Sequence, residues 1–93
     1  MTTPHRPVAV INDTSFYVGP PLARDLARHG FDLVIGDPAD GLVTELEALG
    51  SRVVPVSGGR RVQDPVVAQQ LIDSAMSAFG RVDSAVMFSG RVV

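Results

Sequence analysis

Residues 8–37 read VAVINDTSFYVGPPLARDLARHGFDLVIGD, which divides into a strand, a tight turn, a helix, a second strand and an acidic residue. Residues 8–11 form a short apolar run with β-branched members, which is typical of a parallel strand buried on both faces. Pro20 and Pro21 suit the first turn of a helix, where the N–H that proline lacks is not needed. The apolar run at residues 31–35 supplies the second strand. This segment therefore predicts a βαβ unit.

The same alternation continues along the rest of the sequence. Apolar residues over 42–49 form the stripe of a second helix, and a third strand is expected at 53–56. Asp64-Pro65 is a strong helix start, because a carboxylate at the N-cap is followed by proline at the first helical position. This third helix leads into a fourth apolar strand at 85–88. The sequence thus predicts four strands separated by three helices.

Such an order predicts an α/β fold, because strands separated by helices pair in parallel through right-handed crossovers. The expected architecture is a Rossmann-like three-layer sandwich with sheet order 3-2-1-4, which is half of a doubly wound fold. Pro55 cannot donate to a β-ladder, so the third strand is expected at the sheet edge. Residues 1–93 are expected to form a single domain of the nucleotide-binding type.

The composition excludes several classes of function. The net charge is −2, all eight basic residues are arginines, and there is no cysteine. Nucleic acid is therefore not expected as a partner, and neither is a metal site. No apolar run approaches the length of a membrane span, so we expect no membrane partner and a cytoplasmic location. Without lysine, this chain alone cannot complete a mechanism that requires one.

The chain resembles the short-chain dehydrogenase/reductase family over nearly its full length. That family has a TGxxxGxG turn after its first strand, and Gly19 matches the third glycine. Gly30 follows eleven positions later, as is usual there, and Asp37 follows eighteen positions after Gly19. Residues 62–83, VQDPVVAQQLIDSAMSAFGRVD, look much like the family's third helix and its FGxxD entry into strand four. The resemblance implies an oxidoreductase dependent on NAD(H) or NADP(H).

Departures from the family pattern fall mostly at positions that face the ligand. Asp13 and Tyr17 stand at the first and second glycines of the turn. Arg61 replaces the aspartate near the adenine, and residues 87–90, MFSG, replace the NNAG turn after strand four. Glycines in this turn let backbone N–H groups reach the pyrophosphate, so these changes bear directly on cofactor binding.

The candidate cofactor-binding residues lie around the expected ends of the strands. Gly19 either allows a phosphate to approach or lets the first helix pack closely on the first strand. Asp37 either accepts hydrogen bonds from an adenosine ribose, which favours NAD over NADP, or belongs to a Gly-Asp-Pro turn. Asn12 and Asp13 are site residues or turn caps. The full set is Asn12, Asp13, Ser15, Tyr17, Val18, Gly19, Asp37, Arg61, Val62, Ser89 and Gly90.

No catalytic residue is predicted in this sequence. The family's chemistry needs a serine and a Tyr-x-x-x-Lys pair after strand four, and neither is present here. Two hypotheses follow. In the first, the chain is the dinucleotide-binding half of an NAD(P)(H)-dependent oxidoreductase. In the second, it is a non-catalytic domain that binds another ligand or a partner, with a homo-oligomer or a complementing chain covering its exposed edge.

Overall fold

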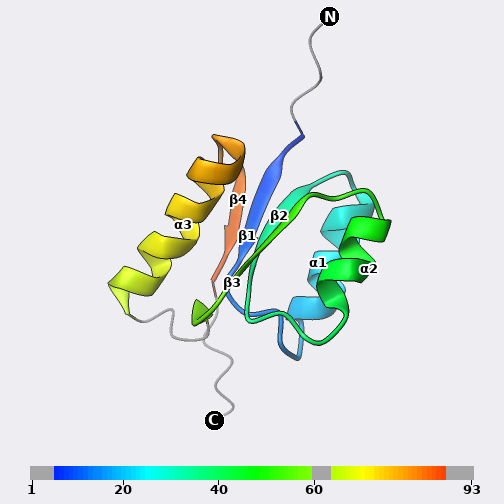
Figure 1. Ribbon diagram of the computed structural model, residues 1–93, viewed down its shortest axis with the longest axis horizontal. Coiled ribbons are helices and arrows are strands. Elements are labelled where there is room, and N and C mark those ends of the chain that lie inside the picture. Colours follow the sequence, from blue (N-terminus) through cyan, green and yellow to red (C-terminus); the bar gives the residue numbers. More distant parts are fainter. Residues whose placement is uncertain (1–5, 60–63, 88–93) are drawn as a thin grey trace, which may run out of the picture.

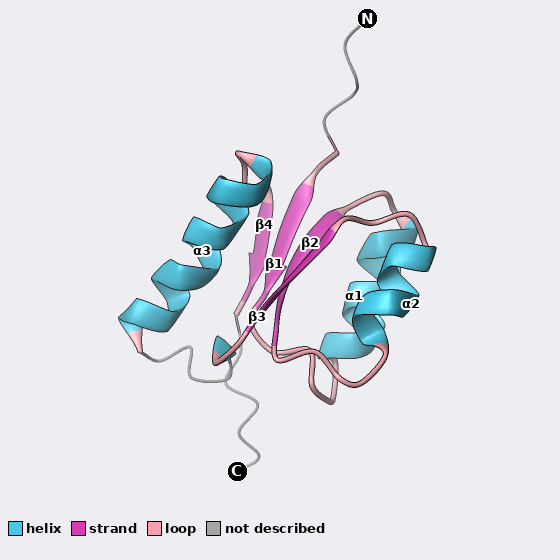
Figure 2. Cartoon of the chain, in the orientation of Figure 1, coloured by secondary structure: helices cyan, strands magenta, loops and turns pink. Residues whose placement is uncertain are grey.

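The computed structural model describes residues 6–59 and 64–87. Within these residues, one parallel sheet has the order β3-β2-β1-β4. Its strands are β1 (Val8–Ile11), β2 (Asp32–Gly36), β3 (Val53–Val56) and β4 (Ser84–Val86), and the helices are α1 (Gly19–Arg28), α2 (Leu42–Ala48) and α3 (Pro65–Phe79). Helices α1 and α2 cover one face of the sheet and α3 covers the other (Figures 1 and 2). The predicted three-layer Rossmann-like fold and its strand order are confirmed.

The sheet separates two apolar cores, because successive side chains of a strand point to opposite faces. Strands β1 and β2 are buried along their whole length, as their apolar runs predicted. The core under α1 and α2 contains Ala9, Ile11, Ala23, Ala27, Leu33, Ile35, Leu42 and Leu46. The core under α3 contains Val8, Val10, Val34, Leu71 and Ala75. Both strands therefore contribute to both cores, which fixes them at the centre of the sheet.

The helix boundaries follow the local signals in the sequence. The side chain of Asp64 accepts a hydrogen bond of 2.9 Å from the backbone N–H of Val66, which caps α3. Pro65 occupies the first turn of α3, and Gly80 ends the helix with a left-handed φ of 74°. Helix α1 has prolines in its first turn as well. The predicted Asp64 N-cap and the prolines in the first helical turns are confirmed.

Three boundary predictions differ from the structure. Strand β2 begins at Asp32 because the N–H of Phe31 donates to the carbonyl of Leu26 (3.0 Å), in the turn that ends α1. Strand β4 begins at Ser84 and ends at Val86, and Met87 already lies outside it. Leu49, expected in the buried stripe of the second helix, is 39% exposed because it lies beyond the last residue of α2.

Strand β3 lies at one edge of the sheet, as Pro55 predicted. It pairs with β2 alone among the described strands, and Pro55 is opposite Ile35 in the register. Strand β4 forms the other edge and pairs with β1, with Val10 opposite Ala85. Proline is tolerated at an edge because the N–H it lacks is not needed by a further strand.

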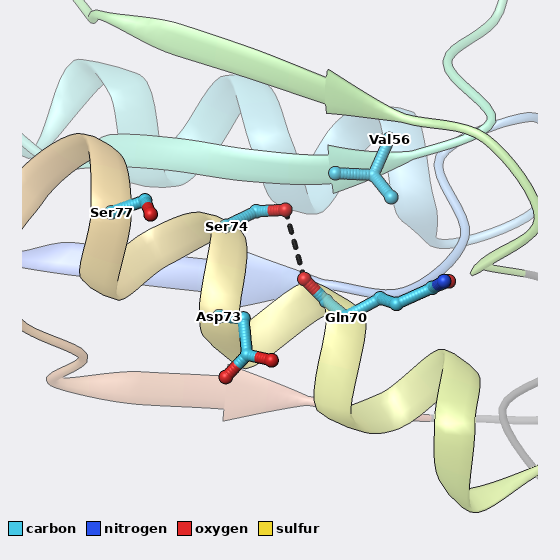
Figure 3. A pocket seen from close by; sticks show the side chains of 5 residues that line it. All are labelled: Val56, Gln70, Asp73, Ser74 and Ser77. Carbon is cyan, nitrogen blue, oxygen red and sulfur yellow. Dashed lines mark hydrogen bonds between the residues drawn. The ribbon is translucent and has the colours of Figure 1, made fainter.

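The polar face of α3 borders an open hollow beside the end of β3. The hollow has a volume of about 480 Å³ and is lined by Val56, Gln70, Asp73, Ser74 and Ser77 (Figure 3). The hydroxyl of Ser74 donates to the carbonyl of Gln70 at 2.8 Å, one helical turn away. This hydroxyl is thus occupied within the helix itself.

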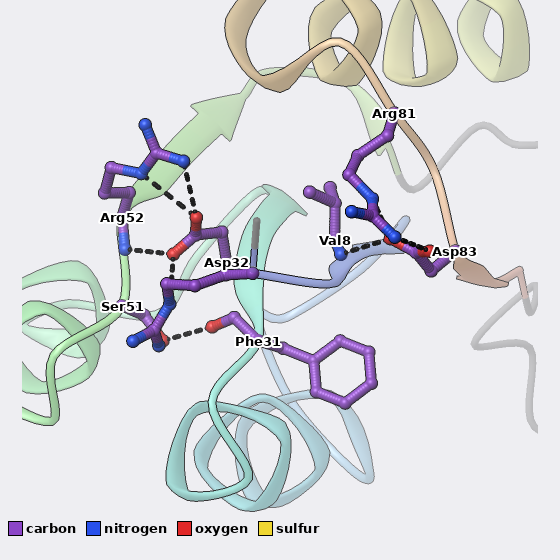
Figure 4. Close-up of polar contacts among 8 residues, drawn as sticks. Val8, Phe31, Asp32, Ser51, Arg52, Arg81 and Asp83 are labelled. Atoms are coloured by element: carbon purple, nitrogen blue, oxygen red, sulfur yellow. Dashed lines mark hydrogen bonds and ion pairs between the residues drawn. The ribbon is translucent and has the colours of Figure 1, made fainter. Parts of the chain in front are cut away.

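A buried carboxylate joins several segments at the amino end of the sheet. Asp32 is fully buried, and its carboxylate accepts hydrogen bonds from the backbone N–H, Nε and Nη2 of Arg52 at 3.0, 3.0 and 2.8 Å (Figure 4). The guanidinium of Arg6 forms a second ion pair with it at 3.0 Å. Arg52 also lies 5.0 Å from the ring centroid of Phe79, at the end of α3. Asp32 and Arg52 therefore connect β2, the start of β3 and α3.

The pKa of Asp32 reflects two opposing effects. Burial alone would raise the pKa, but hydrogen bonds from Arg52 and the positive charges of Arg52 and Arg6 outweigh it, so the pKa is lowered. A second carboxylate, Asp83, accepts a hydrogen bond of 2.7 Å from the N–H of Val8 and pairs with Arg81 at 2.6 Å. Hydrogen bonds from Arg81, and then from Val8, lower its pKa. Asp32 thus holds the start of β2 against the residue before β3, and Asp83 holds the start of β1 beside β4.

Candidate nucleotide-binding rim

The carboxyl ends of β1, β2 and β3 meet at one end of the sheet, where ligands bind in open α/β folds. We call this end the rim and define it as residues 12–19, 36–37 and 57–59. The backbone of Asn12 lies between two glycines there, since a Cβ on Gly36 or on Gly59 would overlap the Asn12 carbonyl oxygen. Close approach of three chain segments thus requires glycine at both positions. The sequence reasoning did not select these glycines, although a glycine at a strand end is a signal for such contact.

Asn12 holds the rim together through its side chain and its backbone. Its side chain is buried, and Nδ2 donates to the carbonyl of Gly59 at 3.0 Å. Its backbone N–H donates to the carbonyl of Val86 at 3.2 Å. Asn12 therefore ties the end of β1 to the loop after β3 and to β4, which is a structural role at a predicted site position.

Asp13 caps the turn between β1 and α1. Its Oδ1 accepts hydrogen bonds from the backbone N–H of Ser15 at 2.9 Å and from the Ser15 hydroxyl at 2.5 Å. The side chain of Asp13 is buried. The turn-capping interpretation of Asp13 describes this geometry. As a consequence, a carboxylate lies in the turn that would face a pyrophosphate.

Thr14 is a rim residue that the sequence reasoning missed. It is fully buried, and both its N–H (2.8 Å) and its hydroxyl (3.0 Å) donate to the carbonyl of Gly36. Its own carbonyl accepts from the N–H of Ala39 at 3.1 Å. These bonds hold the β1–α1 turn against the end of β2 and the loop that follows it. A small hydroxyl residue after a strand end is the signal that could have found it.

The tip of the turn is apolar and exposed. Phe16, Tyr17 and Val18 are 38%, 75% and 43% exposed. Tyr17 has a φ of 60°, the left-handed conformation that favours glycine. The backbone at this position therefore keeps the shape that a glycine would have, while a large ring projects from it.

Gly19 lies where α1 touches the turn. A Cβ there would overlap the carbonyl oxygen of Asp13 and lie 2.7 Å from the Cα of Thr14. Glycine is therefore needed for close packing of the helix start, whatever ligand the rim holds. Val18 is the N-cap residue of α1 and makes no side-chain capping hydrogen bond.

Asp37 follows β2 directly and is partly buried. Its Oδ1 accepts from the N–H of Gly58 at 2.9 Å, and its own N–H donates to the carbonyl of Val56 at 2.9 Å. Its φ of 45° is left-handed, as in a tight turn. Asp37 thus joins the ends of β2 and β3 beside the β1–α1 turn. The remaining predicted site residues, Arg61, Val62, Ser89 and Gly90, lie outside the described residues.

The described residues contain neither a membrane-spanning helix nor a metal-ligand cluster. No helix within 6–59 and 64–87 is long and apolar enough to cross a membrane. In the same residues, no group of three or more histidine, cysteine, aspartate or glutamate side chains is placed to hold a metal ion.

The sheet order, the short β1–α1 turn and the acidic residue after β2 define a Rossmann-like α/β domain. No family model matches the chain. It is 36% identical over 86 residues to L-rhamnose 1-dehydrogenase (NAD(P)(+)) from Sphingomonas sp. (strain SKA58), and the match covers 87% of this chain and 33% of that protein. The chain spans about a third of the length of the curated relatives it matches.

Solved structures give the same result. A protein from Sinorhizobium meliloti 1021, described as a short-chain dehydrogenase/reductase, has a TM-score of 0.75 and 31% identity, covering 91% of this chain and 40% of its own. A 3-oxoacyl-[acyl-carrier protein] reductase from Brucella melitensis in complex with NAD has a TM-score of 0.74 and 28% identity, covering 89% and 33%. By sequence and by fold, the chain therefore matches a part of short-chain dehydrogenase/reductase proteins, over about a third of their length.

Proposed function

We propose that this chain is the dinucleotide-binding part of a cytoplasmic oxidoreductase that uses NAD(H) in preference to NADP(H). The observation that carries the proposal is the position of Asp37, directly after β2 and held by Gly58 beside the β1–α1 turn. The relatives named above support a nicotinamide cofactor at the level of the family. Hydride transfer itself would need catalytic groups that this sequence does not contain.

Charge is the physical basis for the preference between the two cofactors. A carboxylate has acceptor sites for more than one hydrogen bond, so Asp37 can bind Gly58 and still accept from ribose hydroxyls. A 2′-phosphate at the same place would meet a like charge and would lose the diol contact. We therefore expect NADH to bind more tightly than NADPH, by about tenfold or more, which corresponds to about 1.4 kcal/mol.

A second candidate is a non-catalytic binding or dimerisation module. The exposed tip at Phe16, Tyr17 and Val18 supports it, because contiguous exposed apolar side chains often mark interaction sites. The outer edge of β4 supports it as well, since an edge strand offers unpaired backbone groups to a second copy or a complementing chain. In this candidate the rim would be a scaffold for the tip.

Calorimetric titration of the purified chain with NADH and with NADPH tests the proposal. We expect NADH to bind more tightly, and Asp37→Asn to reduce that preference while keeping an acceptor for Gly58. Asp73→Asn is the matched control, because it removes a carboxylate from the outer face of α3. A chain that is folded by circular dichroism and binds neither cofactor would contradict the proposal and favour the module.

A further inference from the structure

The loop between β2 and α2 contains the dipeptide Asp40-Gly41, and both of its residues are exposed. We propose that Asp40 is a site of spontaneous covalent modification. At this site the peptide bond to Gly41 moves from the backbone carboxyl group of Asp40 to its side-chain carboxyl group, which leaves isoaspartate. The proposal concerns the chain itself and does not depend on the proposed function.

The reaction joins two groups of adjacent residues. The amide nitrogen of Gly41 attacks Cγ of the protonated Asp40 carboxyl group, the N–H proton and the carboxyl hydroxyl leave together as water, and a cyclic succinimide forms. Water then opens the ring at either carbonyl group, which restores aspartate or leaves isoaspartate. The atoms therefore balance, and the mass of the chain is unchanged. Glycine favours the attack because it has no side chain beside the nitrogen.

The turn at 39–42 leaves the reacting groups able to move. The N–H of Leu42 donates to the carbonyl of Ala39 at 3.0 Å, and Gly41 has φ and ψ of 80° and −7°, as in a type II β-turn. Ring closure requires the peptide unit between Asp40 and Gly41 to rotate. Rotation of this unit also relates type II to type I turns, so the hydrogen bond that closes the turn can persist.

No printed contact opposes this rotation within residues 6–59 and 64–87. There, neither the carboxylate nor the carbonyl of Asp40 accepts a hydrogen bond, and the N–H of Gly41 donates none. A Cβ on Gly41 would also meet nothing within 4 Å, so the space beside the nitrogen is open. The dipeptide is thus restrained mainly by the turn around it.

Aspartates that precede a serine are held more firmly. Asp73 is exposed and precedes Ser74, but its carboxylate accepts a hydrogen bond of 2.8 Å from Gln69, and the N–H of Ser74 belongs to α3. Asp83 also precedes a serine, and its carboxylate pairs with Arg81 at 2.6 Å. At Asp73 the attacking N–H becomes available only after the helix opens locally, which lowers the rate.

Isoaspartate at position 40 would change how the loop is held. The backbone would then pass through the side-chain carbons of Asp40, which lengthens it by one carbon between Ala39 and Gly41. The N–H of Ala39 donates to the carbonyl of Thr14 at 3.1 Å, and the carbonyl of Ala39 accepts from Leu42, which is buried under the sheet. A longer backbone displaces one side of these contacts, so the modified chain should unfold at a lower urea concentration.

Mass spectrometry of the aged chain tests the proposal. The purified chain, folded by circular dichroism, is incubated at neutral pH beside a sample in guanidinium chloride, and both are digested with trypsin. Residues 29–52 then carry Asp40 and residues 62–81 carry Asp73. Electron-transfer fragmentation distinguishes the two backbones and assigns the position. Folding should change the rate at Asp40 by no more than about threefold and slow the rate at Asp73 by about tenfold or more.

Asp40→Glu is the matched variant, because it keeps the charge but would have to form a larger ring. Isoaspartate should disappear from the fragment of residues 29–52 in this variant, and its persistence there would overturn the assignment to Asp40. The proposal would equally be overturned if folding slowed the reaction at Asp40 by about tenfold or more, or if no isoaspartate formed there in either sample.

Discussion

Replacing Asp32 with asparagine should destabilise the chain by about 2 kcal/mol at neutral pH. The carboxylate is fully buried and accepts three hydrogen bonds from Arg52, two of them from the guanidinium. Asparagine keeps an acceptor for the backbone N–H of Arg52. Its amide nitrogen, however, would face guanidinium donors, so both charge-assisted bonds and the ion pair with Arg6 would be lost.

The expected size of the destabilisation depends on how exposed the two arginines that pair with Asp32 are. A buried charge-assisted hydrogen bond contributes about 1.5–3 kcal/mol, and two are lost. The side chains of Arg52 and Arg6 are 67% and 37% exposed, so water replaces much of what each guanidinium loses. The lowered pKa of Asp32 means that losing its charge destabilises the folded chain, because the charged form is favoured more in the folded chain than in the unfolded one.

The destabilisation caused by Asp32→Asn should depend on pH. A carboxylate whose pKa is lowered on folding contributes stability above its unfolded pKa, near 3.8, and loses it as the pH falls through the lower folded value. The difference in unfolding free energy between the wild type and Asp32→Asn should therefore be constant above about pH 5 and shrink below about pH 4.

Urea titrations followed by circular dichroism at several pH values measure this difference. Asp73→Asn is the control, because Asp73 is exposed on α3 and bonds to Gln69. A difference below about 0.5 kcal/mol at pH 7 would refute the reasoning, since that is the size expected of a surface substitution. So would a difference that stays the same down to pH 3.

Three further substitutions test the rim by urea titration. Gly36→Ala should lower the free energy of unfolding by about 3 kcal/mol or more, because the new Cβ would overlap the Asn12 carbonyl. Gly30→Ala is the control and should cost about 1 kcal/mol, because Gly30 has a φ of 87° but nothing within 4 Å of the added Cβ. Equal losses for the two variants would disprove the steric argument. Asn12→Asp should cost about 2–4 kcal/mol, because it sets an acceptor against the Gly59 carbonyl, and a loss below about 1 kcal/mol would mean that the Nδ2 bond is unimportant. Tyr17→Gly should be more stable than Tyr17→Ala by about 0.5–1 kcal/mol. Both variants remove the ring, and glycine alone relieves the strain of a φ of 60°. The reverse order of stability would contradict the claim that the backbone is strained at this position.

Much of the fold was predictable because its signals are local. The apolar runs at β1 and β2, the Asp64-Pro65 helix start and the edge position implied by Pro55 all depend on neighbours in the sequence. Physical reasons for these signals, such as a missing N–H or a capping carboxylate, act over a few residues. The order and layering of the elements then follow from the rules for parallel crossovers.

The buried ion pair of Asp32 was not predicted, and its cause is not local. The sequence FDLVI shows an acidic residue in an apolar run, but its partner Arg52 is twenty positions away. The contacts at the rim are similar, since Asn12 donates to Gly59 across 47 positions. Sequence reasoning can mark such residues as unusual, whereas the partner that explains each one depends on the tertiary fold.

The departures from the family's glycine pattern separate two roles of those glycines. Gly19 remains because a Cβ there would overlap the Asp13 carbonyl, so packing alone requires it. Tyr17 keeps a left-handed backbone without being glycine, so the shape of the turn survives at the cost of strain. Asp13 has no positive φ and uses its side chain to cap the turn. The glycine that packing needs is therefore kept, and the two that would open space for a ligand are replaced. The parallel sheet and its helices are consequently preserved in the described residues, while the β1–α1 turn itself has changed.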